Sequence, residues 1–184
     1  MEAAESVKII EKMLQESRKS LSNSSFYFIL WAAIMIPAGI VEWYIFGNPW
    51  FWLIWPIAGS LGGIITMIYS LTKHKTSQVT TAADRISGYT WGVFGICMLF
   101  AIFYSLSLNQ TPHALILLLA GGATIISGGI SKFKPFIIGG FCLIAAAVLC
   151  GFFIEPALHG LIFSAGLTVG YLIPGLMLRN ASNG

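Results

Sequence analysis

The stretch GGATIISGGISKFKPFIIGG, residues 121–140, holds three glycine pairs and a short basic turn between two apolar runs. A phosphate-binding loop of the GxxxxGK[ST] type needs a glycine directly before its lysine. Here Ile130 and Ser131 separate Gly129 from Lys132, so the stretch does not predict nucleotide binding. It fits the inner corner of a membrane hairpin, in which glycines let neighbouring helices approach closely.

Composition places the whole chain in the class of membrane proteins. Of its 184 residues, 57% are hydrophobic and 9% are charged, whereas soluble domains carry roughly 25% charged residues. A helix needs about 20 mostly apolar residues to cross a bilayer. Six such runs cover residues 26–46, 50–72, 88–108, 112–130, 136–154 and 157–178. We therefore predict an all-α, polytopic transmembrane helical bundle over residues 25–184, with the lipid bilayer as its partner.

Lysine and arginine fall on one side of this topology. They occur in residues 1–24, in the segments after the second and fourth runs, and in the C-terminal tail. The turns at 47–49, 109–113 and 155–156 carry none. Because basic loops stay in the cytoplasm, the pattern predicts three hairpins with outer turns and with both termini cytoplasmic. The net charge of +3 is thus explained by orientation, and we expect no nucleic-acid partner.

Residues 1–24 are charged throughout, which argues against a cleavable signal peptide. Within residues 2–22, apolar positions recur along a heptad-like seam, which predicts an amphipathic cytoplasmic helix. Helices that lie on anionic membranes have a strongly basic polar face, but this one has balanced charges. The balance favours docking on protein, either as a homo-oligomer contact or with another protein partner. An interfacial lead-in to the first span is the alternative.

Glycines recur where spans are expected to touch. In lipid, small residues at GxxxG and related spacings allow close backbone approach. The predicted packing positions are Gly59, Gly63, Gly121, Gly122, Gly128, Gly129, Gly166 and Gly170. The pattern does not separate contacts within one chain from contacts between chains. A proline within a span also removes a backbone donor, so we expect kinks near Pro37, Pro56 and Pro174.

The first two hairpins share a spacing. Gly62 and Gly121 are 59 positions apart, as are Lys73 and Lys132. This offset raises the hypothesis of a parallel internal repeat. The alternative is that glycine pairs and basic helix exits are common in membrane helices.

Four ionisable side chains are predicted at the same outer depth: Glu42, His113, Glu155 and His159. Carboxylates and imidazoles titrate usefully and also bind divalent ions, so these residues form a candidate proton-linked or metal-binding site. The alternative is structural. Glu155 and His113 each adjoin a proline, as residues at helix starts do, and Glu42 can snorkel to the surface.

Reactive motifs are missing elsewhere in the sequence. Cys97, Cys142 and Cys150 lie in apolar runs without ligand spacing, and there is no GxSxG or HExxH motif. We therefore assign no catalytic, cofactor-binding or metal-ligating residue, and we expect no cofactor. The enzyme class is the least favoured.

The glycine pairs with KFKPFIIGG, together with GYLIPGLMLR at 170–179, resemble a family of small, uncharacterised bacterial six-helix membrane proteins. The resemblance implies location in the bacterial inner membrane. It provides no activity that could be carried over to this chain. Two functions follow from the sequence. The first is a non-enzymatic membrane scaffold or a signalling partner that acts through residues 2–22. The alternative is a small oligomeric transporter or channel for an ion or small solute.

Overall fold

The computed structural model describes residues 25–74 and 82–183, and every regular element in these residues is helical. The amphipathic helix predicted within residues 1–24 lies outside them. The first span covers Ser25–Tyr44. The next helices are α2 (Ile54–His74), α3 (Ala82–Ser107), α4 (His113–Ser131) and α5 (Lys134–Phe152). The last stretch holds α6 (His159–Leu167), the π-helix η3 (Thr168–Leu172) and α7 (Ile173–Asn183). Two 3-10 turns, η1 (Phe51–Leu53) and η2 (Pro156–Leu158), precede α2 and α6.

Within the described residues, six helical stretches are long and apolar enough to cross a membrane, the sixth being Pro156–Ala181. This confirms the predicted all-α class with six spans, and the chain is a multi-pass membrane protein. α3 begins at Ala82, before the predicted apolar run 88–108. Its first turn contains Asp84, and a carboxylate is favourable at the positive end of a helix dipole.

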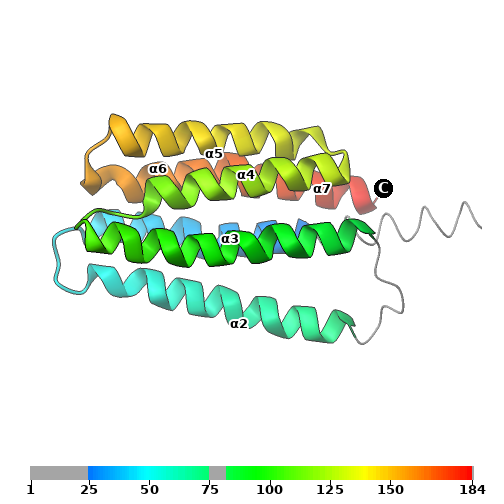
Figure 1. Cartoon of the computed structure of the whole chain (residues 1–184), viewed down its shortest axis with the longest axis horizontal. Helices are drawn as coiled ribbons and strands as arrows, with labels where there is room; N and C mark the ends of the chain where they lie inside the picture. Colours follow the sequence, from blue (N-terminus) through cyan, green and yellow to red (C-terminus); the bar gives the residue numbers. More distant parts are fainter. Residues whose placement is uncertain (1–24, 75–81, 184) are drawn as a thin grey trace, which may run out of the picture.

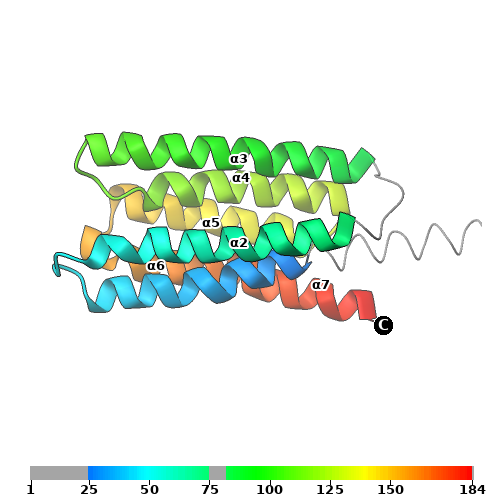
Figure 2. The same cartoon turned by 90° about the horizontal axis from the view of Figure 1, so that it is seen from below.

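The spans lie side by side as three antiparallel hairpins (Figures 1 and 2). The turns after the first span, α3 and α5 lie together at one end of the bundle, which we call the outer end. The α4–α5 turn and the C-terminus lie at the opposite, inner end. Arg85, Lys132 and Lys134 belong to the inner end. The two names follow the charge pattern of the sequence.

The orientation of the bundle is testable with topology reporters. Asn48 lies in the first outer turn and Asn180 near the inner end of α7. An alkaline phosphatase fused after Asn48 is expected to be active, because this enzyme folds only outside the reducing cytoplasm. The same reporter after Asn180 is expected to be inactive. A reversed pair of signals would overturn the predicted orientation.

The core lies between the first span, α4, α5 and the sixth span. Its least exposed large side chains, each at most 4% exposed, include Phe28, Leu117, Phe136, Leu143 and Phe163. α4 and α5 approach closely because glycine faces glycine. A Cβ on Gly121 would lie 2.7 Å from the carbonyl oxygen of Gly140. Any larger residue at this crossing would push the two helices apart.

α2 and α3 form the periphery of the bundle. Their spans are only 11% and 6% buried within the chain, against 50% for the sixth span. Large apolar side chains such as Ile57, Met67, Ile96 and Phe100 are more than half exposed on them. A soluble protein rarely exposes so large an apolar surface. The membrane spans thus imply that this surface is in contact with the lipid bilayer.

The eight glycines predicted to pack helices divide into two groups. At Gly121, Gly128, Gly166 and Gly170, an added Cβ would lie 3.1 Å or less from a neighbouring helix. At Gly59, Gly63, Gly122 and Gly129, nothing lies within 4 Å of that Cβ. The second group does not pack helices within the described part of a single chain. A packing role between chains stays a prediction for these four.

The packing does not support an internal repeat. A Cβ on Gly62 would lie 2.9 Å from the ring of Trp31, within the same hairpin. Its counterpart at the repeat offset, Gly121, contacts α5 of the next hairpin. The corresponding glycines therefore have different neighbours. The structure favours the alternative to a repeat, namely that glycine pairs are common in membrane helices.

Candidate functional site

Glu42 and His113 form a buried ion pair at the outer end of the bundle. Glu42 lies in the last turn of the first span, and His113 is the first residue of α4. Nε2 of His113 lies 2.9 Å from Oε2 of Glu42, and the two side chains are 3% and 5% exposed. The distance is that of an ion pair, although the angles do not meet those of a hydrogen bond. Attraction between the two groups therefore requires a protonated imidazole and an ionised carboxylate.

His159, the first residue of α6, lies next to this pair. Its ring centroid is 5.8 Å from that of His113. Nδ1 of His159 lies 2.6 Å from Oγ1 of Thr111, and Nε2 lies 3.0 Å from the carbonyl oxygen of Ile154. A carbonyl only accepts, so Nε2 carries a hydrogen and, in the neutral ring, Nδ1 accepts from the threonine. The site thus joins one helix from each of the three hairpins.

Two aromatic rings pack against His113. The ring centroids of Trp55 and Phe163 lie 5.0 Å and 5.5 Å from that of His113. Trp55 and Phe163 also lie 5.0 Å from each other, so the three rings contact one another edge to face. Such an apolar wall excludes water and strengthens the electrostatic interactions beside it.

A backbone crossing positions the carboxylate. Gly39 of the first span and Gly160 of α6 lie so close that a Cβ on either would collide with the backbone of the other. The Cβ on Gly160 would also lie 2.7 Å from Oε2 of Glu42. One turn further along α6, Ser164 donates a hydrogen bond of 2.9 Å to the carbonyl of Ile36. The close contact of these two helices therefore brings Glu42 to the first turn of α6.

The start of α4 favours the negative charge of Glu42, whereas the end of Glu42's own helix opposes it. His113 and His159 begin α4 and α6. The N–H groups in the first turn of a helix have no partner within the helix and give that end a partial positive charge. Adding a proton to Glu42, or removing one from His113, would abolish the attraction of the pair while leaving both side chains buried.

Glu155 does not share this environment. It is exposed and directly precedes η2, where its backbone carbonyl accepts a hydrogen bond of 2.9 Å from the N–H of Leu158. This position corresponds to the structural alternative, an acid before the proline of a helix start. In the described residues, no group of three or more His, Cys, Asp or Glu side chains is arranged to hold a metal ion.

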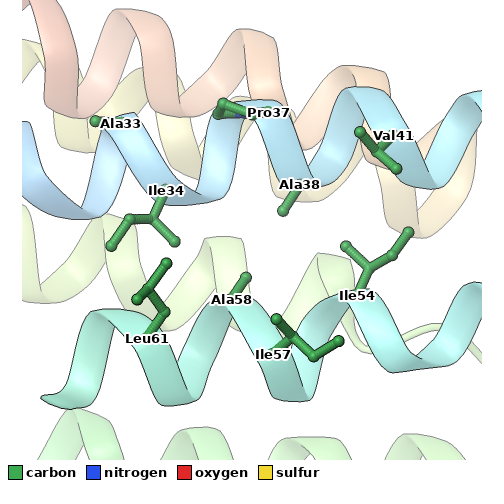
Figure 3. Close-up of a pocket in the computed structure, with 9 residues that line it drawn as sticks. All are labelled: Ala33, Ile34, Pro37, Ala38, Val41, Ile54, Ile57, Ala58 and Leu61. Atoms are coloured by element: carbon green, nitrogen blue, oxygen red, sulfur yellow. The ribbon is translucent and has the colours of Figure 1, made fainter.

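Two apolar grooves lie in the described surface, and the first of them reaches Val41, next to Glu42 in the chain. One groove of about 430 Å³ separates the first span from α2, where Ile34 and Ala38 face Ala58 and Leu61 (Figure 3). A second groove, of about 460 Å³, runs between α3 and α4. Both lie within membrane-spanning helices, and neither offers a charged side chain to a polar ligand.

Sequence reasoning missed several members of the site. Trp55, Thr111, Phe163 and Gly39 carry no motif, and only their spatial contacts assign them to the site. For the crossing of the first span and α6, the sequence did predict a packing position on α6. Gly160 and Ser164 form a pair of small residues four positions apart, a spacing typical of helix contacts in membranes.

No known protein family, curated protein or solved structure matches this chain. The resemblance to a family of uncharacterised bacterial membrane proteins therefore stays a prediction. The helices themselves support only the broader class of multi-pass membrane protein.

Proposed function

We propose that the protein is a membrane transporter for an ion or a small solute, and that transport is coupled to protonation of the Glu42–His113 pair. The observation that carries this proposal is the burial of an ion pair between the first and second hairpins, with His159 of the third hairpin beside it. Ionisable groups in membrane-spanning helices are rare, and they mark proton relays and ion pathways.

The coupling has a direct physical basis. When the pair is ionised, it holds the outer ends of the first span and α4 together. When Glu42 takes up a proton or His113 loses one, that attraction disappears, and separation of the two ends becomes easier. A ligand shifts a conformational equilibrium only through its different affinity for the two states, and here the proton is that ligand.

The predicted orientation and the predicted membrane agree with this function. A cytoplasmic inner end, predicted from the charge pattern, and a bacterial inner membrane, implied by the family resemblance, would expose the outer end to the side with the higher proton concentration. The alternative, a scaffold or signalling partner, depends on residues 2–22, which lie outside the described residues. It remains a prediction.

Flux measurements on purified protein in liposomes test the proposal. With a pH-sensitive dye inside the vesicles, proton flux is expected to follow an imposed pH gradient, alone or with added ions and small solutes. Glu42→Gln removes the ionisable group but keeps its size, and we expect it to lower the flux about tenfold or more. Glu155→Gln is the matched control, because Glu155 is an exposed acid at the same end.

Two results would contradict the proposal. Equal flux in Glu42→Gln and Glu155→Gln would remove the ion pair from the transport mechanism. Vesicles with wild-type protein that conduct no more than empty vesicles, for every solute tested, would favour the scaffold.

A further inference from the structure

The sixth span changes its helix type in the middle. The α-helical pattern of α6 ends at Leu167, a π-helix covers Thr168–Leu172, and α7 begins at Ile173. At the end of the π-helix, the N–H of Ile173 donates to the carbonyl of Thr168, five residues earlier. Pro174 follows directly and has no N–H to donate to the carbonyl of Gly170, as an α-helix would require. The irregularity near Pro174 therefore has an identifiable cause.

The π-helix contacts α5 through glycine. A Cβ on Gly139 of α5 would lie 2.9 Å from the carbonyl oxygen of Gly170 and 3.2 Å from Cγ of Pro174. A Cβ on Gly170 would lie 2.5 Å from Cγ of Leu143. The two backbones therefore approach closely at the point where the sixth span is least regular, and the Leu143 side chain packs on Gly170 there.

The two halves of the sixth span dock on different parts of the first span. Gly160 of α6 packs on Gly39 near the Glu42–His113 pair, while Gly175 of α7 lies against Ile29 at the inner end. Between these docking points, Tyr171 of the π-helix is buried, with its ring centroid 5.0 Å from that of Phe28. The outer half therefore contacts the ion pair and, through Phe163 and Leu167, the core, while the inner half contacts the core alone.

We propose that the π-helix Thr168–Leu172 is a hinge, and that loss of the Glu42–His113 attraction lets α6 swing about it relative to α7. This inference rests on the proposed function and names the conformational device of the same site. π-Helical turns inside α-helices are often found at functional sites. The titratable groups near Glu42 are His113 on α4, His159 on α6 and Cys150 on α5. A swing of α6 would carry His159 and Phe163 away from His113 and open the site at the outer end.

Amide hydrogen exchange of the full chain in lipid nanodiscs tests the hinge independently of transport. The measured quantity is the exchange rate of peptides covering 168–173, compared with peptides of α5. In Glu42→Gln, the first span and α4 lose the attraction that lies against α6, and we expect exchange at 168–173 to rise about fivefold while α5 stays unchanged.

Pro174→Ala supplies the missing donor and is expected to slow exchange at 168–173 about fivefold. It should also suppress the rise caused by Glu42→Gln. Pro135→Ala is the matched control, because Pro135 lies at the start of α5, where no helical donor is needed. It is expected to change neither rate.

The hinge is overturned if Glu42→Gln leaves exchange at 168–173 unchanged, or if it raises exchange equally in every helix. If the Pro174→Ala protein does not fold, the comparison of Glu42→Gln with wild type still decides whether the hinge exists. Flux without the local exchange response would reject the hinge and keep the transporter. The exchange response in a protein without flux would keep the hinge and reject transport.

Discussion

Replacing His113 with leucine is expected to destabilise the folded bundle by about 3–5 kcal/mol, because one member of a buried ion pair would lose its partner. Glu42 is 5% exposed, and Oε2 has no hydrogen-bond partner in the described residues. Its charge would therefore remain buried and uncompensated. The free energy of unfolding can be measured in mixed micelles by titration with SDS, with circular dichroism as the readout.

A double substitution separates the pair from simple loss of packing. Glu42→Leu combined with His113→Leu removes both charges, and apolar replacement of a buried ion pair is often neutral or stabilising. We expect the double variant to recover most of the stability that His113→Leu loses. Glu155→Gln, at an exposed position, is expected to stay within about 0.5 kcal/mol of wild type. A His113→Leu protein as stable as wild type would refute the buried ion pair.

Gly160→Ala is expected to destabilise the bundle by about 3 kcal/mol, since overpacking a tight contact costs about 1–3 kcal/mol and the obstacle here is backbone. The new methyl group would collide with the backbone of Gly39 and would lie 2.7 Å from the Glu42 carboxylate. Neither helix can move aside without separating the first span from α6. The same SDS titration measures the effect.

Gly63→Ala is the matched control for this substitution. Gly63 lies in α2, and nothing is within 4 Å of the added Cβ. Alanine forms helices better than glycine by about 1 kcal/mol, so Gly63→Ala should be neutral or slightly stabilising. Equal losses at both positions would contradict the close contact of Gly39 with Gly160. A loss of oligomer in Gly63→Ala alone would instead assign this glycine to a contact between chains.

The ion pair, the glycine crossing and the π-helix form one connected structure. The crossing at Gly39 and Gly160 holds Glu42 against α6, and the ion pair ties the first span to α4. α6 then continues into the π-helix. In the proposed mechanism, a proton taken up at the outer end would act on the helix that carries the hinge.

The sequence predicted the depth of the candidate site residues in the membrane, but it did not predict which of them contact one another. Counting residues from the helix ends places Glu42, His113, Glu155 and His159 at one end of the bundle, because a helix rises by a fixed distance per residue. Which of them meet depends on how each helix is rotated about its axis. The structure brings Glu42, His113 and His159 together and leaves Glu155 exposed. That rotation is set by packing across hairpins, which no local pattern encodes.

The sequence by itself determined the membrane class, the six spans and their pairing into hairpins. These properties are local, because hydrophobic length decides whether a segment crosses the bilayer and loop charge decides on which side it emerges. Only the tertiary structure decided which glycines face a neighbour, which acid is buried and where the sixth span changes its helix type. Those properties depend on contacts between residues far apart in the chain, such as Glu42 with His113 and Gly39 with Gly160. The glycines of residues 121–140 show the same division, since Gly121 packs against α5 while its neighbour Gly122 has open space beside it.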